Sequence, residues 1–264
     1  SGELSNGIVA MNGGELNVDE SITISSNLVH LADSIIDILS EKSLIYTGDE
    51  FEIEDLLLTF NGEGTFSNTE NINLNDSAST IKLNGISELK NVSISEDLIS
   101  GKLEIAESTI ISNISHDGKS RIFVDNAMSL TISNAFEIPN GITMELLGSG
   151  ETRTIKLPDT LTLSGTLSVN STGYTISDGT LGISGGVLEI SENLSIDSDI
   201  THLSSGNISV ETDKILTYTG TSTEVGALTL TLSGGGNIQT TNDLTLNDPD
   251  SILSLNDINI SGVS

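Results

Sequence analysis

The sequence repeats itself, and this repeat limits what the chain can fold into. Residues 1–92 align without a gap on residues 173–264, an offset of 172 that we call the long period. The segment KSLIYTGDEFEIEDLLLTFNGEG, which begins at Lys42, overlays KILTYTGTSTEVGALTLTLSGGG, which begins at Lys214. Fixed periods of this kind are typical of solenoids, in which each repeat packs only on its neighbours.

A weaker period lies inside the first. The three histidines of the chain are His30, His116 and His202, and their spacing of 86 is half of the long period. The aliphatic residues around His30 and His116 also match at this spacing. We therefore predict one continuous solenoid over residues 1–264, with internal repeats of approximately 1–92, 93–178 and 179–264.

Within each repeat, short runs alternate aliphatic and small polar residues, as in Ile22–Ile24, Leu161–Leu163 and Leu244–Leu246. This alternation indicates β-strands with one buried face. Gly, Asn, Asp and Ser separate the runs and supply turns. No segment keeps a helical stripe over three turns; Leu28–Leu39 comes nearest, but its repeat partners have the strand pattern.

Three such strands would make one coil of about 21–22 residues, so that the chain would form about twelve coils. Tyr and Phe together number eight and Trp is absent, so burial must come from Ile, Leu and Val. We expect six to eight of these in each coil, each contributing about 1.5–3 kcal/mol on burial. The predicted fold is all-β, a single-stranded parallel β-helix or β-solenoid.

The formal charge of −29, from 38 acidic and 9 basic residues, disfavours binding to nucleic acid or to anionic membranes. No stretch approaches the roughly 20 apolar residues of a membrane span, and the start of the sequence lacks the pattern of a signal peptide. The chain has no cysteine, which excludes disulfides and thiolate metal sites. The acidic, Lys-poor composition favours an extracellular location.

The Gly-rich turns between short strands, as in GTLSVNSTGYTISDGTLGISGGVLEISENLSI, resemble the β-helical stalks of filamentous-haemagglutinin-like adhesins and autotransporter passenger domains. The resemblance extends over most of the chain and lies in its general pattern. It implies a secreted, right-handed parallel β-helix that serves as a spacer or a fibre. It assigns no functional residues to positions of this chain.

One short segment has the spacing of a hydrolase nucleophile elbow. Gly182–Gly186 reads GISGG, but an elbow needs a helix after the serine, and no helical pattern follows. The repeat counterpart, Ala10–Gly14, has Asn12 at the serine position. We expect a turn between coils, and we predict that the chain is not an enzyme and has no catalytic, cofactor-binding or metal-binding residues.

Acidic clusters in the sequence suggest specific calcium binding as one hypothesis, and a simpler alternative stays open beside it. Asn75–Asp76, Asp197–Asp199 and Asp248–Asp250 offer the oxygens that calcium prefers, although none matches an EF-hand or a calcium β-roll. The alternative is a solvated acidic face that attracts cations without a defined site. The histidines, four coils apart, would be too distant to share a metal; we expect them at a recurring corner, each with a hydrogen bond.

These observations predict a structural repeat module of an extracellular fibre, filament or large surface adhesin. Neither the first nor the last ten residues have the polar pattern of a solenoid cap, so we expect copies or neighbouring repeats to stack end to end. A surface glycan or protein receptor is a further expected partner. The alternatives are a carbohydrate-binding or depolymerising phage tail fibre or tailspike, and an ice-binding solenoid, which would need Thr-x-Thr in every coil.

Overall fold

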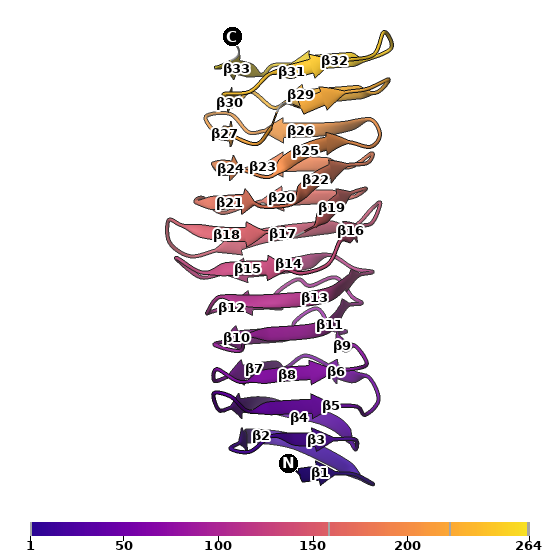
Figure 1. The fold of residues 1–264 in the computed structure, drawn as a ribbon, viewed down its shortest axis with the longest axis vertical. Coiled ribbons are helices and arrows are strands. Elements are labelled where there is room, and N and C mark those ends of the chain that lie inside the picture. The colour runs from indigo at the N-terminus through magenta and orange to yellow at the C-terminus, as the bar shows by residue number, and fades with distance from the viewer. Residues whose placement is uncertain (1, 158, 222, 263–264) are drawn as a thin grey trace. The chain divides into compact units, whose positions relative to one another are not determined.

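The computed structural model describes residues 2–157, 159–221 and 223–262, which form parallel β-strands stacked as a solenoid of about twelve turns (Figure 1). No helix occurs in these ranges, so none can span a membrane. The predicted all-β solenoid is confirmed. The outer limits of the predicted repeats, residue 1 and residues 263–264, lie outside the described residues.

The chain divides into two compact units, Ser1–Ser133 and Asn134–Ser264, and each is described on its own. This boundary does not coincide with a limit of the predicted repeats. Continuity of one solenoid over the whole chain stays a prediction.

Unit 1 contains fifteen described strands, and most have three to five residues. They are β1 (Gly2–Leu4), β2 (Ile8–Val18), β3 (Ile22–Ile24), β4 (Asn27–Ile38), β5 (Ser43–Tyr46), β6 (Phe51–Ile53), β7 (Leu57–Asn61), β8 (Thr65–Asn68), β9 (Ile72–Leu74), β10 (Thr80–Asn84), β11 (Glu88–Ile94), β12 (Lys102–Ile105), β13 (Thr109–His116), β14 (Ser120–Val124) and β15 (Ser129–Ile132).

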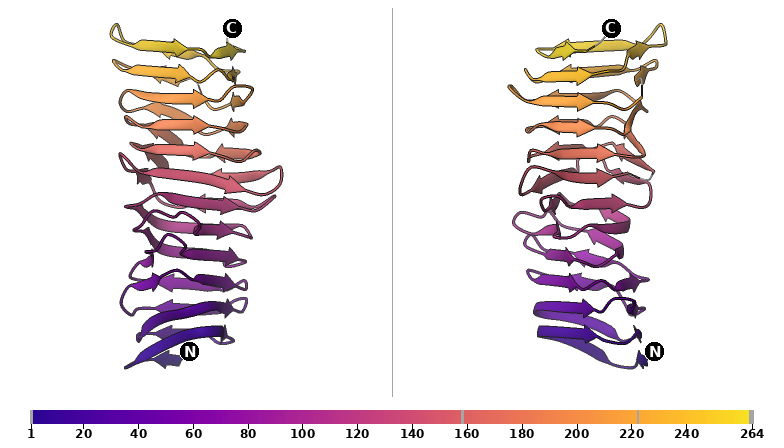
Figure 2. Two further views of the ribbon diagram at one scale, coloured as in Figure 1. Left: turned by 180° about the vertical axis from the view of Figure 1, so that it is seen from behind. Right: turned by 60° about the vertical axis from the view of Figure 1, so that its left-hand side comes forward.

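Every register given for unit 1 is parallel, and the partners are strands of successive turns. One sheet has the order β2-β4-β7-β10-β12-β14, a second has β1-β3-β5-β8, and a third has β6-β9-β11-β13-β15. Thr80 of β10, for example, lies beside Lys102 of β12. Figure 2 shows these strands from two further directions, one turn above the next.

Unit 2 contains eighteen described strands. They are β16 (Phe136–Ile138), β17 (Thr143–Gly148), β18 (Arg153–Lys156), β19 (Thr160–Leu163), β20 (Thr166–Val169), β21 (Tyr174–Ser177), β22 (Thr180–Ile183), β23 (Val187–Ile190), β24 (Leu194–Ile196), β25 (Asp199–His202), β26 (Gly206–Val210), β27 (Ile215–Tyr218), β28 (Thr223–Val225), β29 (Thr229–Ser233), β30 (Asn237–Thr240), β31 (Leu244–Leu246), β32 (Ile252–Asn256) and β33 (Asn259–Ser261).

Each turn of unit 2 contributes one strand to each of three sides, as predicted. The orders are β17-β20-β23-β26-β29-β32 on one side and β18-β21-β24-β27-β30-β33 on the next. The third side consists of β16-β19-β22-β25 followed by the pair β28-β31. The length of a turn varies around the predicted value: a short turn places Leu103 beside Ile122 in unit 1, and a long one places Phe136 beside Leu161 in unit 2.

Unit 1 departs from three separate strands per turn because its four longest strands, β2, β4, β11 and β13, pass a corner without a break. Two of them do so at an asparagine. Asn91 in β11 and Asn113 in β13 have φ values of 49° and 57°, in the left-handed region. Asparagine tolerates this conformation better than most residues. The long strands therefore bend at these residues and belong to two sides at once.

The inward-facing side chains fill the centre of each turn. The turn that runs from residue 80 to residue 101 shows the number predicted for one coil. Its buried apolar residues are Ile81, Leu83, Ile86, Leu89, Val92, Ile94 and Leu98, all 0% exposed. Strands that alternate in this way are stable only when a neighbouring turn covers each edge of the core.

Candidate functional site

The two units share several side-chain hydrogen bonds between successive turns, at positions related by the long period. We call these contacts braces. Tyr46 is 1% exposed, and its hydroxyl accepts the N–H of Leu28 at 3.2 Å and donates to the carbonyl of Asp49 at 2.7 Å. In unit 2 the hydroxyl of Tyr218 accepts from Ile200 at 3.4 Å and donates to the carbonyl of Thr221 at 2.5 Å. Each tyrosine thus fastens a corner to a strand of the preceding turn.

The glycine two residues after each tyrosine is part of the same brace. A Cβ on Gly48 would lie 2.6 Å from the Tyr46 hydroxyl and 2.8 Å from the carbonyl of Ser26. A Cβ on Gly220 would lie 2.8 Å from the Tyr218 hydroxyl. The Tyr-Thr-Gly sequence, which recurs with the long period, therefore recurs because the corner leaves no room for a side chain.

A second brace recurs with the same period. The amide of Asp76 donates to the hydroxyl of Ser79 at 2.9 Å, and this hydroxyl donates to the carbonyls of Ile53 and Glu54 in the preceding turn. The amide of Asp248 donates to Ser251 at 3.1 Å, which in turn donates to the carbonyl of Val225 at 2.6 Å.

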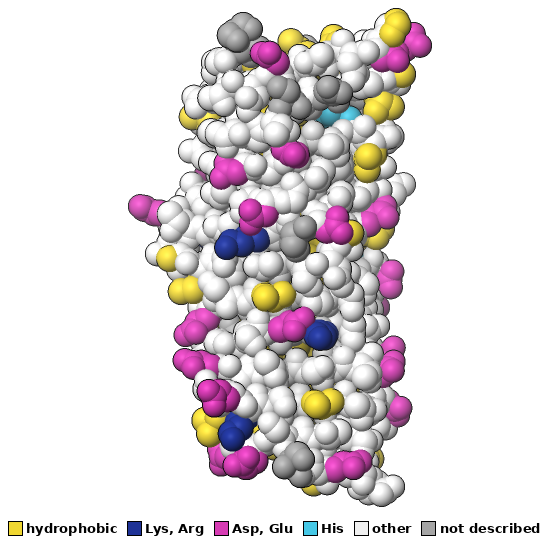
Figure 3. All heavy atoms as spheres, in the orientation of Figure 1, with side chains coloured by type: hydrophobic (Ala, Val, Ile, Leu, Met, Phe, Trp, Pro, Cys, Tyr) yellow, Lys and Arg dark blue, Asp and Glu magenta, His cyan; other side chains and the backbone are white. Residues whose placement is uncertain are grey.

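Ion pairs also recur between neighbouring turns. Lys42 lies 3.4 Å from Glu20, and its counterpart Lys214 lies 2.7 Å from Glu192. Figure 3 shows acidic side chains spread over the visible face, with the few basic ones beside them. In unit 1, Glu104 contacts both Lys82 and Lys102, at 2.8 and 2.6 Å. Burial acts to raise the pKa of Glu104, but hydrogen bonds from these lysines outweigh it and lower that pKa.

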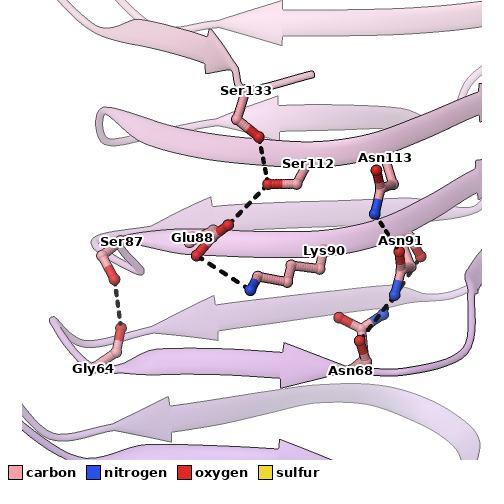
Figure 4. Close-up of polar contacts among 9 residues, drawn as sticks. All are labelled: Gly64, Asn68, Ser87, Glu88, Lys90, Asn91, Ser112, Asn113 and Ser133. Carbon is pink, nitrogen blue, oxygen red and sulfur yellow. Dashed lines mark hydrogen bonds and ion pairs between the residues drawn. The ribbon is translucent and has the colours of Figure 1, made fainter. Parts of the chain in front are cut away.

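Amide side chains form a ladder along one corner of unit 1 (Figure 4). The Asn91 side chain donates to the carbonyl of Asn68 at 2.9 Å, and Asn113 donates to the side-chain oxygen of Asn91 at 2.9 Å. A second chain of contacts, also in Figure 4, joins Ser112 to Glu88 at 2.8 Å. These contacts tie turn to turn and leave no converging set of reactive groups among the nine residues drawn.

The three histidines occupy equivalent inward positions, and for His30 and His202 the predicted hydrogen bond is wrong. Each lies in a strand beside an apolar residue of the preceding turn: His30 beside Met11, His116 beside Ile94 and His202 beside Ile183. Neither ring nitrogen of His30 or His202 has a hydrogen-bond partner among the described residues. His30 and His116, which are 4% and 3% exposed, stand in the core where the neighbouring turn has an apolar residue, and His202 is half-buried. The alternation of the strand determines the direction of each ring.

Burial changes the acidity of these histidines. It lowers the pKa of His30, although nearby Asp33 acts in the opposite direction, and it lowers the pKa of His202. It lowers the pKa of His116 to about 4. Among the described residues, no group of three or more His, Asp or Glu side chains has the geometry to hold a metal ion.

In the segment Gly182–Gly186, residues 184–186 form a turn between two strands, as expected from the repeat. Strand β22 ends at Ile183, and β23 begins at Val187. The amides of Ser184 and Gly186 both donate to the carbonyl of Leu163 in the preceding turn, at 2.8 and 3.1 Å. These bonds place the serine at a corner between strands, without the helix that a nucleophile elbow requires.

The predicted acidic clusters accept hydrogen bonds, between successive turns at Asp199 and within a single loop at Asp76 and Asp248. The side chain of Asp199 accepts the amide of Thr221 at 3.0 Å and its hydroxyl at 2.7 Å, and these bonds lower the Asp199 pKa. Asp248 accepts the amide of Asp250 at 2.9 Å, and Asp76 accepts that of Ala78 at 3.1 Å. Calcium binding by these carboxylates stays a hypothesis.

The last described turn exposes residues that are buried elsewhere in the chain. Leu246 and Leu255 are 49% and 52% exposed, whereas their counterparts one long period earlier, Leu74 and Leu83, are 0% exposed. An apolar hollow of about 250 Å³ opens among residues of the last turns. Its lining includes Leu216, Tyr218, Leu232, Leu253 and Ile260.

The first described turn is exposed in the same way. Leu4 is 43% exposed, whereas its counterpart in unit 2, Ile176, is 0% exposed. A hollow of about 170 Å³ lies against Gly13 and Gly14 in β2. Residues 2–18 and 244–262 thus include apolar side chains that are exposed although their counterparts in the other unit are buried.

No protein-family model matches the sequence, and the searches of curated proteins and of solved structures find no match either.

Proposed function

We propose that this chain is a structural repeat module of an extracellular fibre, filament or large surface adhesin. The observation that carries the proposal is the recurrence of the same braces with the long period. A solenoid gains length by adding turns, and each turn depends on the next for burial. The tyrosine corners, the serine braces and the lysine–glutamate pairs all serve this stacking.

The amino-acid composition supports the extracellular location of this proposed module. With 38 acidic and 9 basic residues, the surface repels anionic polymers and stays hydrated. The lack of cysteine is compatible with any redox environment.

Surface labelling of intact cells of the source organism tests this function. Antibodies raised against the purified chain should stain unpermeabilised cells or material shed from them, and external protease should remove the signal. Staining that requires permeabilised cells would contradict the proposal. An antibody to a cytoplasmic protein is the control for cell integrity.

One observation supports a second candidate function, a tail fibre or tailspike that binds or depolymerises carbohydrate. A hollow of about 290 Å³ in unit 1 is lined by Asp49, Glu50, Glu52 and Glu54 beside Asn27. The counterparts of Asp49 and Glu54 in unit 2 are Thr221 and Gly226, so this acidic set departs from the repeat. Paired carboxylates are what a glycan hydrolase uses. Release of reducing ends from cell-surface polysaccharide, lost in Glu52→Gln, would favour this candidate, and no release would exclude it.

A further inference from the structure

One side of the solenoid has an interrupted ladder at equivalent places in the two units. In unit 1, residues Asn27–His30 of β4 pair with β2 in the preceding turn, and β6 pairs with β9 in the following turn. Among the described residues, no strand pairing joins Asn27–His30 to β6. The other two sides are continuous at this level, because β3 pairs with β5 and the second half of β4 pairs with β7.

The interruption recurs in unit 2 one long period later. There β25 pairs with β22 and β28 pairs with β31, but β25 and β28 belong to different sheets. The other two sides are again continuous, because β24 pairs with β27 and β26 pairs with β29. We call these two boundaries, Asn27–His30 against β6 and β25 against β28, the seams. With ladders on two sides of three, the strand edges at a seam should separate more easily than those of a complete ladder.

A surface hollow opens at each seam. The hollow in unit 1 has a volume of about 290 Å³, and its lining includes Asn27 and Asp49. The hollow in unit 2 has a volume of about 430 Å³, and its lining includes the counterparts of these residues, Asp199 and Thr221. The hollow is therefore a feature of the wall that recurs together with the seam.

A histidine lines each hollow, His30 in unit 1 and His202 in unit 2. The ring of His30 lies across the seam from Phe51 of β6, edge to face, with 6.1 Å between the ring centroids. The ring nitrogens of both histidines have no hydrogen-bond partner among the described residues. A neutral imidazole can occupy such a position, whereas a charged one without a partner is strongly disfavoured there.

Carboxylates lie around each seam and can accept a charged imidazole outside the core. Near His30 they are Asp33 on the same strand and, across the seam, Asp49, Glu50, Glu52 and Glu54. Near His202, the titratable side chains that the structure describes are Asp199 on the same strand and, from the following turns, Tyr218 and Asp243. The strand segments of the preceding turns, Ile8–Met11 and β22, carry no titratable side chain.

We propose that each seam is an acid-sensitive opening in the wall of the solenoid. When His30 or His202 gains a proton, its ring leaves the core for the hollow, and the two unpaired strand edges of that seam separate. The ladders on the other two sides keep the turns stacked. This property belongs to the wall of the solenoid and does not depend on the fibre function proposed above.

The direction of the pH effect follows from the two states of the seam. Burial lowers the pKa of both histidines in the closed seam, although Asp33 acts against this at His30. An open seam exposes the ring to water, where its pKa is about 6.5. The open state therefore binds more protons than the closed state as the pH falls below about 6.5. At pH 5 this difference favours opening by at most about 30-fold relative to neutral pH.

The test compares hydrogen–deuterium exchange of the unmodified chain and of His30→Leu between pH 7 and pH 5. The ratio of the two exchange rates at each pH removes the pH dependence of the chemical exchange step. The most direct reporter is the amide of Leu28, which donates to the Tyr46 hydroxyl of the following turn. The ratio of unmodified chain to variant at Leu28 and in β6 should rise as the pH falls, by at most about 30-fold.

The second seam is the matched control in the same molecule. His30→Leu should leave exchange of the Ile200 amide and of β28 unchanged. His202→Leu should change exchange at Ile200, whose amide donates to the Tyr218 hydroxyl, and should leave Leu28 unchanged. The amides of β10, which is paired on both edges, should give the same ratio at every pH.

An equal pH dependence at Leu28 in the unmodified chain and in His30→Leu would overturn the proposal. Acid-induced exchange as large in β10 as at the seam would also overturn it, because the whole stack would then be loosening. If circular dichroism shows that His30→Leu is unfolded, the unmodified chain alone decides. Its His30 ring resonances and the exchange of Leu28 relative to β10 should then change together between pH 7 and pH 5. A ring that titrates without any change at Leu28, or no change in either, would contradict the opening.

Discussion

The Tyr46 brace offers a quantitative test of how the turns are held together. Tyr46→Phe keeps the ring, which packs 6.2 Å from Phe51 between centroids, and removes only the hydroxyl. The N–H of Leu28, a residue 4% exposed, then loses an acceptor at 3.2 Å. Leaving one buried donor without its partner costs about 1–3 kcal/mol.

Hydrogen–deuterium exchange measures this loss locally, which matters because repeat arrays need not unfold in one step. A loss of about 1–3 kcal/mol corresponds to about 5- to 150-fold faster exchange of the amides in segment 24–50. Tyr218→Phe should have an effect of similar or smaller size in segment 196–221, because its bond from Ile200 is longer, 3.4 Å.

A matched control is Ile45→Val, at a neighbouring position that is 41% exposed, where exchange should change less than twofold. The reasoning would be refuted if Tyr46→Phe left segment 24–50 unchanged. It would also be refuted if the variant accelerated exchange equally in unit 2, because the brace would then have no local role.

Three other predictions follow from the described contacts. Gly48→Ala should destabilise by about 1–3 kcal/mol, because its Cβ would lie 2.6 Å from the Tyr46 hydroxyl. In the Tyr46→Phe background the added cost should be smaller, and an equal cost in urea unfolding would contradict this contact. His116 has its pKa lowered to about 4, below the 6.5 of the unfolded chain, so the unfolded state binds more protons between these values. Stability from this group is therefore lost as pH falls from about 6.5 towards 4, by about 3 kcal/mol at most. His116→Leu should reduce the drop in urea midpoint between pH 7 and pH 4.5, and an unchanged drop would argue against burial of the ring. Millimolar calcium should raise the melting temperature relative to chelator at equal ionic strength if the acidic turns bind it, and coincident melting curves would reject calcium binding.

The fold could be predicted from the sequence because the repeat and the strand alternation are both visible in the order of residue types. Ile22–Ile24 and Leu161–Leu163 alternate as strands, and each forms a strand in the structure. Even Leu28–Leu39, which comes nearest to a helical pattern, lies largely in β4, as its repeat partners indicated. The length of the turn followed from the period, since half of the long period divides into four coils.

The braces could not be predicted from the sequence. They join residues of successive turns, and the residue types that form them differ between the two units. The side chain of Asn27 accepts the amide of Asp49, whereas in unit 2 Asp199 accepts the amide of Thr221. The chemistry recurs although the residue types differ. The corners at Asn91 and Asn113 were missed as well. The alternation shifts by one residue at each of them, so that Leu89 and Val92, and likewise Ile111 and Ile114, both face the core three residues apart.

The histidines show where reasoning from residue type failed. A polar ring suggested a hydrogen-bonded corner, but the position of His202 in the column of Ile183 sets its direction inward. The alternation of the strand outweighed the preference of the side chain. The signal was present, since the residue two positions before His202, Ile200, also faces the core.

Methyl and aromatic nuclear Overhauser contacts would test the central claim, a parallel stack whose turns recur with the long period, most directly. The structure places Phe60 beside Leu83 in unit 1 and Leu232 beside Leu255 in unit 2. These pairs are counterparts in the repeat, and both contacts should appear in spectra of the 27.6 kDa chain. Absence of either contact, or a shift of one pair by two residues relative to the other, would contradict the account.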